Sequence, residues 1–229
     1  MSGYFRDKFL SGDQHFGHGA MLNPNTVGRP FSSVEEMNEA LIDNHNSIVK
    51  PNDIVIFLGD FALRIPDDEV ARIFHRLNGE KHLIIGNHDV DKRGNLLPAL
   101  ARLPWAKPPV HLSEINHGGT RIVLSHYAMM TWNARHHGAY QAFGHSHGRL
   151  VGLPGTLDVG VDAQNFRPIS VEDFILQAEN TLIDAPRIID EHLNTLSHEL
   201  YRDGGWAERG RQIEEEREAK ARLSQRRTL

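Results

Sequence analysis

Residues 53–60 read Asp-Ile-Val-Ile-Phe-Leu-Gly-Asp, and this stretch does most to decide the fold. Apolar side chains follow one another without interruption from Ile54 to Leu58, which is typical of a strand buried on both faces of a parallel sheet. Gly59 allows the backbone to turn sharply where the strand ends, and Asp60 then places a carboxylate at that end. The stretch therefore predicts an α/β protein with a ligand site along one edge of the sheet.

Strand and helix patterns alternate on both sides of this stretch. Short buried strands are predicted at residues 8–10 and 82–85. Helices are predicted where apolar residues recur every three or four positions, which happens after Ser33, after Pro66 and around Leu100. Such alternation is typical of parallel strands with helices packed against the sheet.

The pattern changes to consecutive strands from about residue 110. Segments 110–115 and 121–124 flank Gly118-Gly119, a pair that favours a tight hairpin turn. Two more strands are predicted at 139–143 and 157–161. The change from alternating units to consecutive strands indicates two packed sheets with helices outside them. We therefore expect an α/β protein built as a two-sheet β-sandwich flanked by helices.

The end of the chain has a different composition. Residues 214–227 are dominated by charge, and Glu216 with Lys220 is a favourable pair one helical turn apart. We predict one domain over residues 1–182 and a helical, charged C-terminal extension over residues 183–229. The extension is expected to be solvated, and a partner-binding arm is the alternative.

Composition excludes several classes of function. The chain of 229 residues has no cysteine, which rules out disulfides, thiolate nucleophiles and iron–sulfur clusters. Its net charge of −5 argues against a dedicated nucleic-acid-binding surface. No apolar run approaches the ~20 residues of a membrane helix, and residues 1–8 do not resemble a signal peptide. We expect a cytoplasmic protein without a membrane partner, and composition leaves its oligomeric state open.

Residue types that bind metals stand at the ends of the predicted strands. They are carboxylates, imidazoles and one amide, in the order Asp13, His15, Asp60, Asn87, His126, His145 and His147. In open α/β sheets, ligands bind at the carboxyl ends of the strands. Side chains two positions apart in extended backbone point the same way, so we expect Asp13 to converge with His15, and His145 with His147.

Each motif alone has an ordinary structural explanation. Asp-x-His occurs often by chance, Asp60 could cap a helix, and His88 after Asn87 could be structural. The pair His145 and His147 is harder to explain by packing, because a buried ring needs a partner for each nitrogen. Five motifs at strand ends together favour one shared site. Their oxygen and imidazole groups suit two transition-metal ions, with Asp60 able to bridge ions ~3.5–4 Å apart.

The ordered set resembles the pattern of the calcineurin-like metallophosphoesterase superfamily, which is D-x-H, G-D, G-N-H-[DE], H and G-H-x-H. The resemblance covers residues 9–167 and is greatest to the small bacterial or phage-type phosphoesterases. Protein serine/threonine phosphatases typically show G-D-x-x-D-R-G, whereas residues 59–65 here are Gly-Asp-Phe-Ala-Leu-Arg-Ile. The resemblance implies the two-sheet fold expected above and a metallophosphoesterase domain over residues 1–182.

The resemblance also implies a role for each residue of the site. The ligands of one metal would be Asp13, His15, Asp60 and His147. The ligands of the other would be Asp60, Asn87, His126 and His145. His88 would be the catalytic residue that protonates the leaving oxygen or stabilises charge on the phosphate.

The expected activity is hydrolysis of a phosphate ester by a metal-activated hydroxide. Ligands without thiolate suit manganese, iron, zinc, cobalt or nickel better than calcium or magnesium, and manganese is our working choice for the two divalent ions. The leading interpretation is a phosphodiesterase acting on a small or nucleotide-derived substrate. A phosphomonoesterase of the same fold and a non-catalytic metal-binding scaffold or interaction protein are the alternatives.

Overall fold

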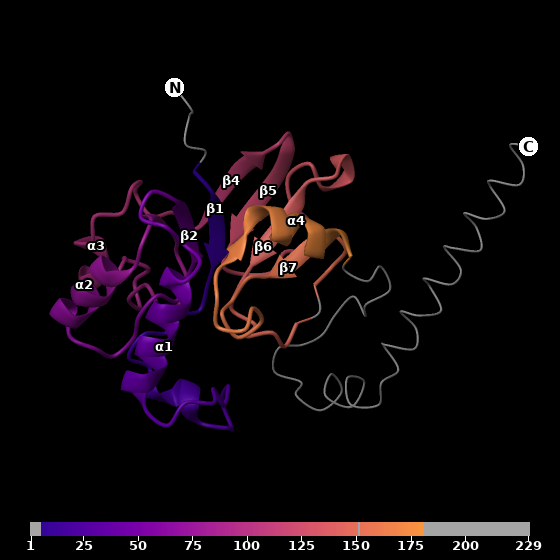
Figure 1. Ribbon diagram of the computed structural model, residues 1–229. Helices are drawn as coiled ribbons and strands as arrows, with labels where there is room; N and C mark the ends of the chain where they lie inside the picture. Colours follow the sequence, from indigo (N-terminus) through magenta and orange to yellow (C-terminus); the bar gives the residue numbers. More distant parts are fainter. Residues whose placement is uncertain (1–5, 151, 181–229) are drawn as a thin grey trace, which may run out of the picture. The chain divides into compact units, whose positions relative to one another are not determined.

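Two four-stranded sheets lie at the centre of the fold (Figure 1). The computed structural model describes residues 6–150 and 152–180 of the chain. The extension predicted over residues 183–229 lies outside these ranges. The two sheets and the helices beside them confirm the predicted α/β fold with a two-sheet core.

The first sheet is built around the strand that residues 53–60 predict. Its strand order is β3-β2-β1-β8. The members are β1 (Lys8–Ser11), β2 (Ile54–Leu58), β3 (Glu80–Ile84) and β8 (Ile169–Ser170). Strands β1, β2 and β3 run parallel, whereas β8 is antiparallel to β1. Parallel pairing brings the carboxyl ends of β1, β2 and β3 to one edge of the sheet.

The second sheet comes from the consecutive strands, in the order β4-β5-β6-β7. The members are β4 (Leu112–His117), β5 (Thr120–Ser125), β6 (Tyr140–Phe143) and β7 (Thr156–Asp158). Strands β4 and β5 form the predicted hairpin, and Gly118 and Gly119 between them have φ of 57° and 89°, as a tight hairpin turn requires. Strands β5, β6 and β7 run parallel, so their carboxyl ends also share one edge.

Three helices lie beside the first sheet (Figure 1). They are α1 (Val34–Asn46), α2 (Asp67–Arg76) and α3 (Pro98–Ala101). Ser33 caps α1 by accepting a hydrogen bond from the backbone N–H of Glu36 at 3.1 Å. The third helix is a single turn, because Pro98 begins it and Pro104 disfavours helical backbone just before itself.

Two elements near the end of the described residues are not predicted by the periodicity. Strand β8 has only two residues, and α4 (Val171–Glu179) follows it directly. Ser170 caps α4 by accepting a hydrogen bond from the backbone N–H of Asp173 at 3.0 Å. Short 3₁₀ helices also occur at η1 (Gly19–Leu22) and η2 (Arg135–His137). None of the helices within 6–150 and 152–180 is long and apolar enough to cross a membrane.

Strand β2 is buried on both faces, as its uninterrupted apolar sequence predicts. Val55 and Phe57 pack into a core shared with α1, α2 and α3. Ile56 and Leu58 pack into a second core together with side chains of the second sheet and α4. Leu58, the last residue of the strand, is fully buried. Its tight packing holds the backbone in place at the point where Gly59 and Asp60 follow.

His45 is a titratable residue within the first of these cores. It lies on α1, its ring stacks on Phe57, and its Nε2 lies 2.9 Å from the carbonyl oxygen of Asn78. Burial lowers the pKa of His45 to about 4, although the hydrogen bond to Asn78 favours the protonated ring. The folded protein therefore holds this imidazole neutral in a pH range where the unfolded chain protonates it.

This shift predicts a loss of stability in mild acid. Because the folded pKa of His45 is below the unfolded value of about 6.5, its contribution is present above pH 6.5 and is lost as the pH falls toward 4. We expect His45 to account for about 2 kcal/mol of lost unfolding free energy between pH 7 and pH 5. Urea unfolding of metal-free wild type and His45→Gln at both pH values measures this difference. An equal acid-induced loss in the two proteins would contradict the assignment.

Candidate metal centre

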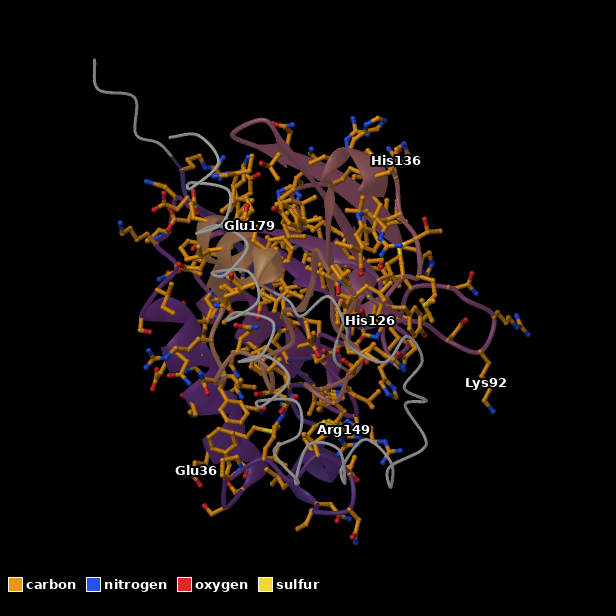
Figure 2. The ribbon with its side chains drawn as sticks, turned by 90° about the vertical axis from the view of Figure 1, so that its right-hand side faces the viewer. Glu36, Lys92, His126, His136, Arg149 and Glu179 are labelled. Atoms are coloured by element: carbon orange, nitrogen blue, oxygen red, sulfur yellow. The ribbon has the colours of Figure 1, made fainter. Side chains whose placement is uncertain are left out.

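The predicted ligands follow the carboxyl ends of strands in both sheets. In the first sheet, β1, β2 and β3 lead to Asp13, Asp60 and Asn87. In the second sheet, β5 and β6 lead to His126 and His145. Figure 2 shows His126 within the body of the domain. The two sheets thus deliver residues that are far apart in the sequence to one region.

The seven predicted ligands come together in two groups. The first ligand group is Asp13, His15 and His147, and the second ligand group is Asp60, His126 and His145. Within each group, ligand atoms from the three residues lie within 4.8 Å of one another. Asn87 joins the second ligand group, because its Oδ1 lies 2.9 Å from His126 Nε2. All seven side chains are therefore neighbours, and their binding of metal stays a prediction.

Asp60 lies between the two groups. Its Oδ2 is 3.4 Å from His15 Nε2 and 3.5 Å from His126 Nε2. Its Oδ1 accepts a hydrogen bond from the backbone N–H of His88 at 2.8 Å, which fixes the orientation of the carboxylate. One carboxylate oxygen thus faces a member of each group, as a bridging ligand of a two-metal site does.

The extended-backbone argument for the two ligand pairs is wrong. The φ angles of Asp13 and His15 are 56° and 50°, and those of His145 and His147 are 66° and 51°, all in the left-handed region. Asp13 and His15 nevertheless converge in the first ligand group, as expected, whereas His145 and His147 belong to different ligand groups. Left-handed backbone costs on the order of 1 kcal/mol or more at such residues, and strain of this kind concentrates at functional sites. Tight turns, and not strand alternation, aim these ligands.

Hydrogen bonds in the centre indicate which imidazole nitrogens are available to a cation. His126 Nδ1 lies 2.7 Å from the carbonyl oxygen of Leu58, which can only accept, so the proton of this ring is on Nδ1. Its Nε2 is then a lone pair facing Asn87 Oδ1, another acceptor. His147 Nδ1 donates to Asp162 Oδ2 at 2.6 Å, so Nε2 is the nitrogen of this ring that remains available to a metal. Among the described residues, His15 Nε2 is buried without a hydrogen-bond partner. A ring nitrogen with a lone pair that faces an oxygen acceptor is the arrangement expected where a cation binds between the two atoms.

The electrostatics of the centre also fit a cation. Burial raises the pKa of Asp13 well above its ordinary value, and the neighbouring carboxylates of Asp158 and Asp60 raise it further. Burial raises the pKa of Asp60 as well, although the backbone N–H of His88 opposes the shift. Burial lowers the pKa of His126 to about 4. Buried carboxylates beside neutral imidazoles are stabilised when positive charge is added between them.

The motif glycines leave room for the carboxylates. A Cβ atom on Gly86 would lie 2.6 Å from the backbone nitrogen of Asp60 and would also collide with its Oδ1. A Cβ atom on Gly144 would lie 2.7 Å from Asp13 Oδ2. The glycines of G-N-H and G-H-x-H therefore allow neighbouring strand ends to approach the ligands closely.

This packing predicts the effect of a methyl group. Gly86→Ala should lower the free energy of unfolding by about 1–3 kcal/mol, because the new atom must displace the backbone of Asp60. Gly19→Ala is the matched control, since the nearest atom to its Cβ would be Val34 Cγ2 at 3.5 Å. Urea unfolding of both variants without added metal checks the prediction, and equal stabilities would contradict it.

His88 stands beside the first ligand group without being part of either group. Its ring centroid lies 5.3 Å from that of His15 and 5.9 Å from that of His18. His18 in turn places its Nδ1 3.1 Å from His15 Nδ1, and burial together with His88 lowers the pKa of His18 to about 4. A half-buried imidazole next to the ligands suits proton transfer, so the catalytic role of His88 stays a prediction that the geometry permits.

Several polar residues around the centre have no role assigned from the sequence. Asp89 accepts hydrogen bonds from the backbone N–H groups of Asp60 and Gly86, and burial raises its pKa to about 6. Asp158, at the end of β7, accepts from the Ser146 hydroxyl at 2.6 Å. The strand-end rule applied to the segment at 157–161 could have found Asp158. Arg29 and Asp162, described below, carry no comparable local signal.

Comparisons with known proteins were made on both sequence and fold. No protein-family profile matches the sequence. The chain is 32% identical over 175 residues to an uncharacterized protein of Methanocaldococcus jannaschii, a match that covers 73% of this chain and 88% of that protein. A solved structure of a protein of unknown function from Aquifex aeolicus has 25% identity and a TM-score of 0.59, and covers 74% of this chain and 97% of that one. A phosphoesterase from E. coli has 13% identity and a TM-score of 0.38, over 67% of this chain and 78% of that one.

Proposed function

The chain belongs to the same family as the Methanocaldococcus jannaschii protein and has the two-sheet calcineurin-like metallophosphoesterase fold, and from this premise we propose that it hydrolyses phosphate esters with two metal ions. One observation carries the proposal. Asp60 Oδ2 lies 3.4 Å from His15 Nε2, a nitrogen that has no hydrogen-bond partner among the described residues. The same oxygen lies 3.5 Å from His126 Nε2, which carries no proton because the proton of that ring is on Nδ1. A carboxylate shared in this way is expected where two ions must be held side by side.

Each ion would have its own ligands. The first ligand group with Asp60 would hold one ion, and the second ligand group with Asn87 would hold the other. Mixed nitrogen and oxygen ligands without thiolate suit divalent transition metals, and manganese is our choice for testing. When bound, the pair would supply Lewis acidity toward the phosphoryl oxygens and lower the pKa of the attacking water.

The residues of the chain would orient the ester and move its proton. In hydrolysis, a bond forms between the water oxygen and phosphorus, the ester P–O bond breaks, and the departing oxygen gains a proton. His88 would donate that proton, because its half-buried imidazole lies beside the first ligand group without belonging to either group, whereas the neighbouring His18 is buried. His18, whose ring lies beside those of both His15 and His88, would hold the ring of His88 in place.

We propose a small or nucleotide-derived phosphodiester as the substrate. Tyr127 follows His126 directly, is 49% exposed, and its ring centroid lies 4.6 Å from that of His145. An exposed aromatic ring next to the ligands offers a surface on which a nucleobase or aryl group can stack. A phosphomonoesterase would use the same ligands, and a non-catalytic scaffold would keep the fold without turnover.

A pair of chromogenic esters tests the proposal. The full-length protein loaded with Mn²⁺ is assayed on bis(4-nitrophenyl) phosphate and on 4-nitrophenyl phosphate, before and after removal of metal with a chelator. We expect metal-dependent turnover with a higher kcat/KM for the diester. A preference for the monoester would favour the phosphomonoesterase. No turnover of either ester by protein that holds two ions would favour the scaffold.

A further inference from the structure

Arg29 is a buried cation that the proposed reaction leaves without a role. Its side chain has no exposed surface. Its Nε donates to Asp162 Oδ1 and its Nη2 donates to Asp162 Oδ2, each at 2.8 Å. This two-pronged pairing of guanidinium with carboxylate is strong and directional. A buried pair of this kind contributes mainly by fixing what it touches, since desolvation offsets much of its attraction.

The same guanidinium holds the backbone between two ligands. Its Nη2 donates to the carbonyl oxygen of Asp13 at 2.6 Å, and its Nη1 donates to the carbonyl oxygen of Gln14 at 2.7 Å. These are the two peptide groups that connect Asp13 to His15. Both ligands have left-handed backbone, which persists only where surrounding contacts enforce it. Arg29 supplies such contacts from a position outside the turn.

Asp162 connects Arg29 to the remaining member of the first ligand group. Its Oδ2 accepts the hydrogen bond from His147 Nδ1 at 2.6 Å. That bond fixes the ring orientation and leaves Nε2 as the nitrogen of His147 that is available to a metal. One arginine and one aspartate thus contact Asp13, the peptide group that precedes His15, and the ring of His147.

The second ligand group has other partners for its side chains, and it meets the first group where the backbone N–H of His145 donates to Asp13 Oδ2 at 2.8 Å. His126 Nδ1 donates to the carbonyl oxygen of Leu58, and the backbone N–H of Asp60 donates to Asp89. Within the described ranges, no recorded hydrogen bond joins Arg29 or Asp162 to a member of the second ligand group.

We propose that Arg29 and Asp162 are positioning residues that set the metal affinity of the first ligand group and leave that of the second unchanged. The inference rests on the two-ion centre of the proposed function. It predicts that substitutions at Arg29 or Asp162 lower the metal affinity of one site only, a result that a general loss of stability would not produce.

Mn²⁺ titration of the full-length protein tests the asymmetry. Arg29→Lys keeps the charge but cannot form the two-pronged pair, and Asp162→Asn keeps the shape but loses the charge. Each should weaken one of two Mn²⁺ sites by about 10–100-fold in calorimetry, with the other site unchanged. With two equivalents of Mn²⁺ per chain, electron paramagnetic resonance should show an isolated ion in each variant, whereas wild type should show a coupled pair.

The surface provides matched controls. Arg76 makes the same two-pronged pairing with Glu39, at 2.7 Å and 2.6 Å, where both side chains are exposed. Arg76→Lys and Glu39→Gln should leave both Mn²⁺ affinities unchanged.

The possible outcomes separate this inference from the proposed function. The inference would be overturned if both Mn²⁺ sites weaken equally. It would also be overturned if neither site weakens in a variant whose metal-free melting temperature is unchanged. If Arg29→Lys does not fold, Asp162→Asn decides by the same criteria, because it is nearly isosteric. Asymmetric weakening in a protein that hydrolyses neither test ester would support the inference while the proposed function fails.

Discussion

Replacing His88 with asparagine is expected to lower turnover of an alkyl phosphodiester by about 10²- to 10⁴-fold while the metal content stays the same. The residue lies beside the first ligand group but in neither group. Its imidazole can donate a proton to an alkoxide leaving group, whereas asparagine cannot. Its backbone N–H, which holds Asp60 Oδ1, is retained in the variant. The kcat of each protein with two bound Mn²⁺ ions is the quantity to compare.

The leaving group provides the sharper test. The loss should shrink for a 4-nitrophenyl diester, because its leaving oxygen departs as a stable anion and needs little protonation. His136→Asn is the matched control, since this histidine lies on the exposed η2 segment away from the ligands (Figure 2). Equal losses for alkyl and aryl esters would remove the proton-donor role and leave stabilisation of phosphate charge.

Asp60→Asn is expected to have the largest effect of any single substitution. The variant has nearly the same shape but loses the negative charge that faces both ligand groups. We expect both metal affinities to fall and turnover to drop by more than about 10³-fold, which corresponds to about 4 kcal/mol of transition-state stabilisation. Metal content by elemental analysis and kcat on the diester, measured at the same Mn²⁺ concentration, give the two quantities.

A second buried aspartate serves as the control for this substitution. Asp53 is 5% exposed and accepts a hydrogen bond from the backbone N–H of Lys50 at 2.8 Å, away from the ligands. Asp53→Asn should affect stability without lowering metal content. A variant at Asp60 that takes up both ions with wild-type affinity would show that this carboxylate does not bridge them.

Local sequence pattern was sufficient to place the candidate ligands on the fold. A strand that is buried on both faces consists of apolar residues, so polar side chains come only after its end. In a parallel sheet these ends lie along one edge, and the polar residues that follow them gather there. That reasoning placed Asp60 after β2 and His126 after β5, and the structure brings both into one group. The alternation of apolar and turn residues likewise predicted the two sheets and the hairpin at Gly118.

The directions of the ligands could not be predicted in the same way. The positive φ angles of Asp13 and His147 depend on contacts with residues distant in the sequence, which an extended-strand argument does not include. Arg29 is 133 positions from its partner Asp162, and neither stands in a motif. Tertiary contacts determine these features. Helix α4 is different, because its signal is local: Ser170 caps it and its buried residues Val171, Phe174 and Ala178 have helical spacing, a pattern that the prediction did not use.

The central claim is that two metal ions share Asp60, and anomalous scattering from crystals grown with Mn²⁺ tests it most directly. The account predicts two anomalous peaks per chain. One should lie among Asp13, His15 and His147, and the other among His126, His145 and Asn87, with the Asp60 carboxylate between them. A single peak at full Mn²⁺ loading, or two peaks of which only one is in contact with Asp60, would contradict it.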